Sequence, residues 1–317
     1  MITVLAGGVG AARFLSGLVR VTPPTSVTAV VNTADDVTLH GLRVCPDLDT
    51  VTYTLAGAVH PRTGWGLAGE TWHVMEALER FAAVAPSGSA AGLTWFRLGD
   101  RDLATHLYRT ARLGEGAGLA VVTAEVVAAW GVEATLVPMT EDPVQTRVTV
   151  AGEGEIGFQE YFVQRRHDVA ASSVRFAGID QARPAPGVLA AFDGADGVVI
   201  APSNPIVSIA PVLAVAGVRD RLRARRRQVV AVSPIVAGAA LKGPAARLMA
   251  ELGHEASVVG VARLWADVAG TLVVDEADAA LAPEVEAAGM RCVVTPSVMH
   301  GPDEAAALAR AAMAALA

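Results

Sequence analysis

The chain has 317 residues, a formal net charge of −7 at neutral pH and 52% hydrophobic residues, enough to bury a large core. The negative charge argues against a non-specific nucleic-acid binder, and no apolar run reaches the ~20 residues that a membrane span needs. No basic segment precedes the first apolar stretch, and the two cysteines lie far apart without zinc-ligand spacing. We therefore expect a reduced, cytoplasmic protein without disulfide bonds.

Short apolar runs alternate with longer helical patterns along most of the chain. This alternation predicts an α/β protein with a mostly parallel sheet and helices on both faces. The predicted strands are 2–6, 27–32, 134–138, 147–151, 197–201, 228–232, 257–259, 271–274 and 291–295.

The stretch 66–130 differs from the rest because it is rich in Ala, Leu, Glu and Trp. This composition indicates several helices without intervening strands. We expect a single α/β domain over 1–317 with a mainly helical subregion at about 60–130.

A glycine-rich turn follows the first predicted strand. Gly7, Gly8 and Gly10 stand between the strand 2–6 and a helix whose first turn carries Arg13. Glycine lets the backbone approach a ligand closely, and a helix N-terminus presents free N–H groups and partial positive charge. The pattern indicates a phosphate cradle, although a tight turn that holds no ligand has the same sequence features.

Polar residues end the second strand: Asn32, Thr33, Asp35 and Asp36. A dinucleotide-binding fold has an acid for the ribose near this spacing, but the third glycine of its fingerprint is missing here. Two acids with an amide and a hydroxyl suit a hard divalent cation, Mg²⁺, better. The alternative is an Asp-rich turn without a ligand.

Two further acids, Asp47 and Asp49, precede an apolar helical stretch. An N-cap role explains one of them. It does not explain four acids within the fifteen residues 35–49, beside a predicted phosphate site. Paired carboxylates there can hold Mg²⁺, or one can accept a proton from an attacking hydroxyl.

A charged segment opens another predicted helix. Arg97 and Arg101 flank Asp100 and have the chemistry of a phosphate clamp, because arginine binds phosphate in a bidentate way. The alternative is a helix capped by aspartate with an internal ion pair. We expect His106, farther along this helix, to be at the surface or packed rather than catalytic.

Three proline-stiffened polar loops follow predicted strands. Ser203 and Asn204 lie in the first, and the others are 233–235 and 295–297. Their position at strand carboxyl ends predicts one shared cleft. The sequence lacks Gly-x-Ser-x-Gly, His-Glu-x-x-His and a Walker lysine, so serine hydrolase, zinc protease and P-loop kinase functions have no support.

Taken together, these motifs resemble the 2-phospho-L-lactate transferase family (CofD/FbiA type) of coenzyme F-420 biosynthesis, in the same order and over essentially the whole chain. The glycine loop is similar to that of the bacterial branch. The motifs that carry the resemblance are 7–10, 31–36, 45–50, 99–106, 158–160, 201–205 and 233–235.

The resemblance implies a reaction. The donor is a guanosine diphosphate diester of phospholactate or, in the bacterial branch, of phosphoenolpyruvate. The ribityl hydroxyl of the deazaflavin Fo attacks the distal phosphorus, and GMP leaves. The resemblance also implies Mg²⁺, a homodimer and a Rossmann-like core with a smaller, largely helical region.

Site roles carry over as expectations. Asp35 and Asp49 hold Mg²⁺ or orient the hydroxyl, and Arg101 is the third expected catalytic residue. The other expected substrate-binding residues are Gly7, Gly8, Gly10, Arg13, Asn32, Thr33, Asp47, Arg97, Asp100, Ser203 and Asn204.

Two other functions remain open. A non-enzymatic regulator of the gluconeogenesis-factor type, which binds a nucleotide sugar or dinucleotide, shares the Gly-Gly loop and the Ala-Asp-Asp strand end, but its next segment differs from 36–41 here. An NAD-dependent oxidoreductase needs a His, Tyr or Lys constellation at the hydride site, and the sequence does not offer one.

Overall fold

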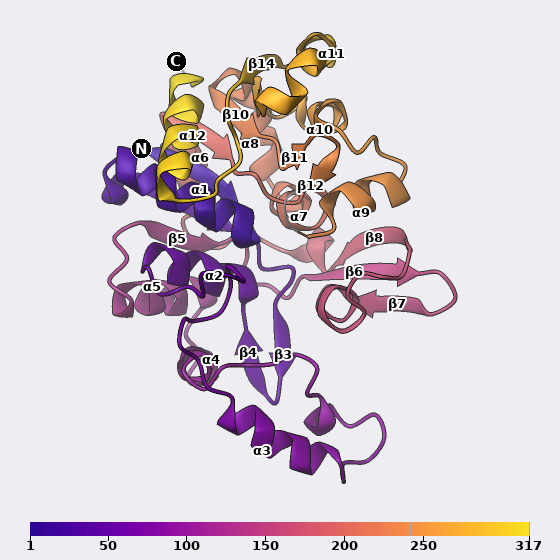
Figure 1. Cartoon of the computed structure of the whole chain (residues 1–317). Coiled ribbons are helices and arrows are strands. Elements are labelled where there is room, and N and C mark those ends of the chain that lie inside the picture. The colour runs from indigo at the N-terminus through magenta and orange to yellow at the C-terminus, as the bar shows by residue number, and fades with distance from the viewer. Residues whose placement is uncertain (241–242, 317) are drawn as a thin grey trace.

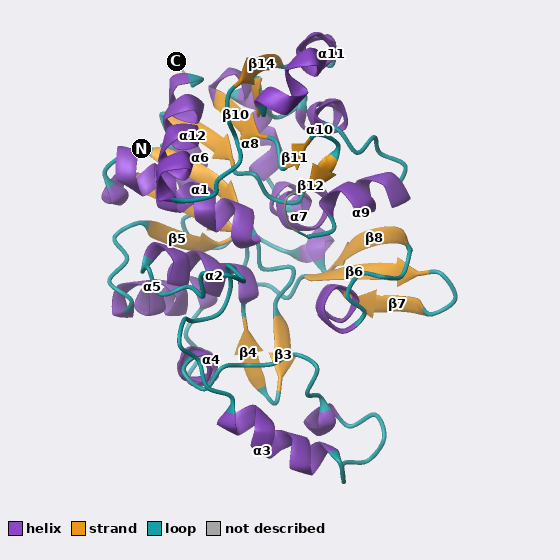
Figure 2. Cartoon of the chain, in the orientation of Figure 1, coloured by secondary structure: helices purple, strands orange, loops and turns teal. Residues whose placement is uncertain are grey.

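The computed structural model describes residues 1–240 and 243–316, and its centre is a seven-stranded parallel sheet (Figures 1 and 2). Every neighbouring pair of strands runs parallel. In spatial order the strands are β14 (Arg291–Val294), β13 (Thr271–Val274), β10 (Val229–Val232), β9 (Gly197–Ile200), β1 (Ile2–Ala6), β2 (Val27–Val31) and β5 (Thr135–Pro138).

The sheet separates two hydrophobic cores. Along β1, Val4 and Ala6 enter one core and Leu5 enters the other, as strand alternation requires. Helices cover both faces, which confirms the predicted Rossmann-like architecture. One core is packed by α1 (Gly8–Val21), α2 (Pro46–Leu55), α5 (Leu119–Ala129) and α12 (Pro302–Ala314); the other by α6 (Val188–Asp193), α7 (Ala210–Ala214), α8 (Val218–Ala224), α9 (Ala245–Glu251), α10 (Val258–Trp265) and α11 (Ala282–Ala287).

The chain reverses its direction of travel across the sheet between β1 and β9. From β1 it proceeds through β2 to β5, whereas β9 leads through β10 and β13 to β14. The loops after β1 and β9 therefore lie at the switch point of the sheet, on its carboxyl edge, which is the usual ligand position in such sheets. This places the predicted glycine turn and the Ser203–Asn204 loop side by side.

Two predicted strands differ from the structure. The run 147–151 lies in a separate antiparallel sheet of β7 (Gly154–Gly157), β6 (Gln145–Val150) and β8 (Ala171–Ala177). The run 257–259 is the start of α10, because the Ser257 hydroxyl accepts hydrogen bonds from the N–H groups of Val259 and Gly260 and caps the helix. A short apolar run does not distinguish a strand from a buried helix.

A small lobe lies below α2 in Figure 1. The hairpin β3 (Val37–Leu39) and β4 (Leu42–Val44) leads toward α3 (His73–Ala82) and α4 (Asp102–Gly114). A third, small core of Leu39, Val44, Met75 and Leu98 holds the lobe together. The helices α3, α4 and α5 lie in the stretch that the composition predicted to be helical, with turns and loops before α3 and between α3 and α4.

The remaining elements are short. None of the helices among the described residues is long and apolar enough to cross a membrane. The short elements are β11 (Ile235–Val236), β12 (Ala239–Ala240), η1 (Pro24–Ser26), η2 (Ala90–Gly92), η3 (Glu160–Gln164), η4 (Ile179–Gln181), η5 (Pro205–Ile209), η6 (Arg226–Gln228) and η7 (Glu276–Leu281).

Candidate active site

The glycine turn between β1 and α1 packs tightly against the loop after β9. A Cβ on Gly10 would lie 1.9 Å from the carbonyl oxygen of Pro202, so only glycine fits there. Gly8 has a φ of +62°, which glycine adopts without strain. The Ser203 hydroxyl donates a 2.6 Å hydrogen bond to the carbonyl of Gly7. The two loops thus form one rigid unit at the switch point.

The N-terminus of α1 faces a carboxylate in this structure. A hydrogen bond from the Gly8 N–H stabilises the ionised form of Asp47, which begins α2. Arg13, one turn into α1, is half-buried and donates a 3.3 Å hydrogen bond to the carbonyl of Met299. The turn therefore binds an anionic group, as a phosphate cradle does.

Asp35 and Asp47 form an acid pair bridged by one amide. The Asn32 Nδ2 donates to Asp35 Oδ2 at 3.1 Å and to Asp47 Oδ2 at 3.0 Å, while Asn32 Oδ1 accepts from the N–H of Ala34. Thr33 is buried in the same turn. The Oδ1 of Asp35 is buried and makes no hydrogen bond of ordinary length and angle, although the nearby Thr146 hydroxyl lowers the pKa of this carboxyl. This oxygen is a candidate ligand position.

Burial and nearby carboxylates make these two acids hard to ionise. Burial, and secondarily the Asp47 charge, raise the pKa of Asp35 well above its usual value. Burial raises the pKa of Asp47 to about 7, against the opposing hydrogen bond from Asn32. A positive charge placed between them would relieve both effects.

Asp36 is a charge partner rather than an open ligand. It receives the guanidinium of Arg43 at 3.0 Å and the thiol of Cys45 at 2.9 Å. Burial raises the pKa of Asp36 to about 6, and Arg43 counteracts part of that rise. The side chain holds the β3–β4 hairpin to the end of β2.

Asp49 lies in a buried ion pair with Arg109, a residue that the sequence reading missed. The two terminal nitrogens of Arg109 donate to the two carboxylate oxygens, and His106 Nδ1 lies 3.7 Å from Asp49 Oδ2. On its other side, His106 Nε2 lies 3.3 Å from Asp102 Oδ2, so His106 is packed, as expected.

The spacing of Asp102, His106 and Arg109 contained a signal for this cluster. Residues at i, i+4 and i+7 share one face of a helix, here α4. The hydroxyl of Tyr53, from α2, donates to Asp102 Oδ1 at 2.6 Å and continues the polar contact. This face of α4 therefore binds the first turns of α2, where Asp47 and Asp49 lie.

The structure does not bring the predicted arginine clamp to these acids. Arg97 is exposed and stacks over the ring of Trp72, with 5.1 Å between the guanidinium carbon and the ring centroid. Arg101 is exposed and donates to the carbonyl of Ala68 at 2.8 Å. In the described part of the chain, no ion pair or hydrogen bond joins either side chain to the aspartates. Arg109 is the arginine that reaches Asp49.

The carboxylate of Asp100 forms hydrogen bonds within the lobe. It accepts from the Thr71 hydroxyl at 2.6 Å and from the N–H groups of His73 and Val74 at 2.9 and 3.0 Å. These hydrogen bonds, that of Thr71 first, lower the pKa of Asp100. The side chain caps the start of α3 and not the helix that its own segment opens, whose first N–H groups, those of Arg101 and Asp102, bind Glu70.

Asn204 and Gln159 complete the surroundings. The Asn204 Oδ1 accepts from the N–H groups of Ile206 and Val207, while its Nδ2 is buried with no hydrogen-bond partner. Gln159 donates to the backbone carbonyl of Asp35 at 3.1 Å. The unpartnered amide of Asn204 is a donor available to a ligand.

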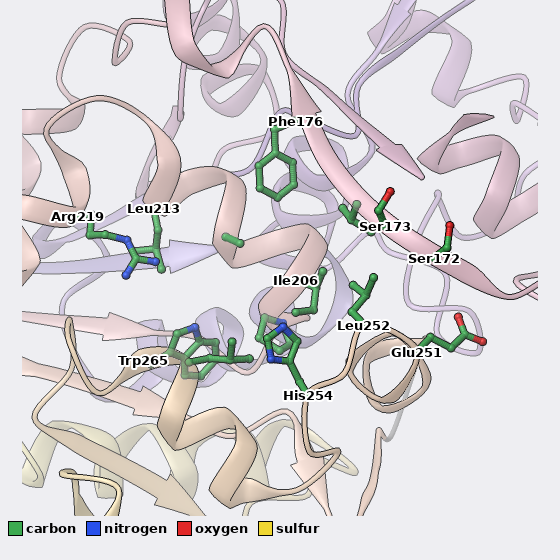
Figure 3. Close-up of a pocket in the computed structure, with 14 residues that line it drawn as sticks. Ser172, Ser173, Phe176, Ile206, Leu213, Arg219, Glu251, Leu252, His254 and Trp265 are labelled. Atoms are coloured by element: carbon green, nitrogen blue, oxygen red, sulfur yellow. The ribbon is translucent and has the colours of Figure 1, made fainter. Parts of the chain in front are cut away.

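A cavity of about 530 Å³ lies elsewhere, between β8 and the helices η5, α7, α9 and α10 (Figure 3). Phe176, Ile206, Leu252 and Trp265 form apolar walls, and no predicted site residue lines it. Ser208 of η5 packs against Gly7, so η5 stands between the cavity and the glycine turn. The chemistry-bearing residues are therefore outside the cavity.

Comparison with protein families gives a match over nearly the entire chain. The family model "2-phospho-L-lactate transferase CofD" matches residues 2–298. Proteins named phosphoenolpyruvate transferase are similar throughout. The one from Streptomyces griseus is 45% identical and covers 98% of this chain and 97% of its own, and the one from Thermobifida fusca is 44% identical over 98% and 96%.

Solved structures are similar at the level of the fold. Two crystal structures of a Bacillus halodurans protein, described as a upf0052 family member in one title, match with TM-scores of 0.63 and 0.60. Each covers 98% of both chains, at 17% and 16% identity. Identity this low shows the shared Rossmann-like α/β fold alone.

Proposed function

Because the chain belongs to the CofD family of 2-phospho-L-lactate transferases, we propose that it is the phosphoenolpyruvate transferase of coenzyme F-420 biosynthesis. The observation that carries this proposal is the acid pair beside the switch-point turn. Asp35 and Asp47 share the amide of Asn32 next to the N-terminus of α1, and Asp35 Oδ1 is buried without a hydrogen bond of ordinary geometry.

The donor in this proposal is a guanosine diphosphate diester of phosphoenolpyruvate, and the acceptor is the deazaflavin Fo. The terminal ribityl hydroxyl of Fo forms a new bond to the distal phosphorus. The bond from that phosphorus to the bridging oxygen breaks, and GMP leaves with the electron pair. Such a transfer asks the protein for positioning and charge stabilisation rather than for its own nucleophile.

The diphosphate binds at the glycine turn. The N–H groups of Gly8 and its neighbours, the dipole of α1 and the charge of Arg13 favour an anion there. Displacement of the Asp47 carboxylate from Gly8 by phosphate frees Asp47 for a cation. The Asn204 amide nitrogen, buried without a partner, donates to the guanosine or the bridging phosphate.

Magnesium fits the acid pair. A magnesium site in a phosphoryl-transfer enzyme needs one or two carboxylates, with substrate phosphates and waters as its other ligands. Asp35 and Asp47 would hold the cation, because both accept from the Asn32 amide, whereas Arg109 engages Asp49. When bound, the cation neutralises charge on the diphosphate.

Asp49 then has the second of its two expected roles. It orients the attacking hydroxyl and accepts its proton, because the Arg109 fork leaves the outer lone pairs of the carboxylate free. Arg97, Arg101 and Asp100 have no part in this mechanism.

We further propose that the protein is a cytoplasmic homodimer. Light scattering in solution tests the dimer.

To test this proposal, the purified protein is incubated with Fo and each guanylyl donor, in Mg²⁺ or in EDTA. Mass spectrometry then identifies the products. We expect a Mg²⁺-dependent mass gain on Fo and release of GMP, with the phosphoenolpyruvyl donor preferred. Asp35→Asn should reduce turnover at least about 100-fold, whereas Asp303→Asn, an exposed surface change, should not. Unchanged Fo with every donor would refute the transferase assignment.

A further inference from the structure

The ion pair of Asp49 and Arg109 is buried, and a buried ion pair contributes little net stability to a fold. Arg109 is 2% exposed and Asp49 5% exposed. Two charges removed from water cost several kcal/mol each, so an apolar pair of the same volume is often equally stable. Stability of the fold alone therefore does not account for a charged pair at this position. Its neighbour Asp36, which interacts electrostatically with Asp49, connects it to the acid pair.

We propose that Arg109 is a positioning residue that fixes the orientation of the Asp49 carboxylate for the attacking hydroxyl. This inference rests on the proposed function. Both guanidinium nitrogens engage Asp49, so the carboxylate plane follows the plane of the guanidinium. A single point charge would leave that plane free to rotate.

Neighbouring groups hold Arg109 itself in place. Its Nη1 also donates to the carbonyl of Arg43 at 3.3 Å, which fixes the guanidinium to β4. His106 lies between Asp49 and Asp102, and Tyr53 contacts both Asp102 and Thr105. The orientation of Asp49 is thus set by α4 and β4 together, not by α2 alone.

The decisive variant is Arg109→Lys, which keeps the charge and removes the fork. We expect kcat to fall about 100-fold with the KM for either substrate changed less than about threefold, because a carboxylate displaced by 1 Å costs about that much in rate while the binding groups remain. A kcat within about threefold of the wild type would overturn the proposal.

The same helix supplies a matched control. Arg112 of α4 makes an equivalent two-nitrogen contact with Glu125, at 3.0 and 2.8 Å, away from the aspartates. We expect Arg112→Lys to leave kcat unchanged. An equal loss in both variants would mean that α4 has only a structural role and would overturn the proposal.

A double substitution tests whether Arg109 acts through Asp49. We expect Asp49→Asn with Arg109→Lys to be no slower than Asp49→Asn alone, since the group to be positioned is already lost. Multiplied losses would overturn the proposal. If Arg109→Lys does not fold, Asp49→Asn with Arg109→Met removes both buried charges, should fold, and should match the turnover of Asp49→Asn.

The wild-type assay separates the two claims. No transfer by the wild type would refute the proposed function and this inference together. Transfer by the wild type, with normal kcat in Arg109→Lys, would overturn the inference and leave the function standing.

Discussion

At the scale of single residues, the informative feature is that four neighbouring aspartates have different partners. Asp36 and Asp49 each receive an arginine, whereas Asp35 and Asp47 share one neutral amide. An acid that lacks a cation and is buried is destabilising in its charged form. The uncompensated pair is therefore the place where a cation or a proton is expected.

This charge arrangement makes stability depend on pH. Asp36 and Asp47 have pKa values raised to about 6 and about 7, above those of the unfolded chain. The folded protein then holds protons that the unfolded chain releases, so their stabilising contribution is complete below about pH 4 and disappears as pH rises to about 7. In EDTA, Asp47→Asn should raise the free energy of unfolding at pH 8 by about 4 kcal/mol, because the pKa of Asp47 rises from 3.8 to about 7 and each of these roughly three units corresponds to about 1.4 kcal/mol.

Urea titrations of both proteins at pH 5 and pH 8 measure this effect. Asp303→Asn serves as the control, since Asp303 is exposed and pairs with Arg20 at the surface. We expect the difference between Asp47→Asn and the wild type to shrink at pH 5. Equal stability of the two proteins at pH 8 would contradict the raised pKa of Asp47.

At the scale of elements, the site depends on two loops that can approach each other only through a glycine. Gly10 meets the carbonyl of Pro202, and the Ser203 hydroxyl binds the carbonyl of Gly7. A second close approach, Gly17 against the backbone of Ala305, joins α1 to α12 far from the aspartates. The two glycines make the same kind of contact at different places.

A comparison of alanine variants at Gly10 and Gly17 therefore separates the effect of packing from the effect on catalysis. Gly10→Ala would force the β9 loop away from α1, because the new Cβ would lie 1.9 Å from an oxygen atom. We expect turnover to fall at least tenfold. Gly17→Ala should lower the melting temperature, since its Cβ would lie 2.2 Å from the backbone of Ala305, but keep kcat per folded molecule. Calorimetry and steady-state kinetics on both variants test this, and normal turnover of Gly10→Ala would contradict it.

At the scale of the whole molecule, burial is unevenly distributed. Every residue of β1, β2, β9, β10 and β13 is buried, whereas α3 buries only Met75. Trp65, Trp72 and Phe81 are exposed on the lobe. Elements with few buried apolar contacts open at low free energy.

Hydrogen exchange should reveal this gradient. We expect amides of α3 to exchange at least about 100-fold faster than those of β1 and β9. The terminal helix α12 is the control, because it buries five residues, Ala305, Ala306, Leu308, Ala309 and Ala312, and should be protected despite its place at the chain end. Equal protection of α3 and α12 would show that the lobe is more stable than its burial indicates.

The sequence by itself determined the fold class and the switch-point residues. The β-branched runs, the glycine turn and the polar strand ends are local signals, and local signals suffice for a parallel sheet whose strand ends share one edge. They also carried the family resemblance. The separate antiparallel sheet and the helix at 258–265 were missed, because short apolar runs have no distinguishing period.

Only the tertiary structure decided which charges meet. The sequence motifs favoured Arg97 and Arg101 as partners of the phosphate and the acids. In the structure those two arginines bind elsewhere in the lobe, and Arg109 of α4 is the arginine that pairs with Asp49. Likewise, Asn32 pairs Asp35 with Asp47 rather than with Asp49. Pairing of charges depends on how α2, α4 and the end of β2 pack together. Helical spacing marks the polar face of α4, but no local pattern shows that Asp49, 60 residues away, is the partner of Arg109.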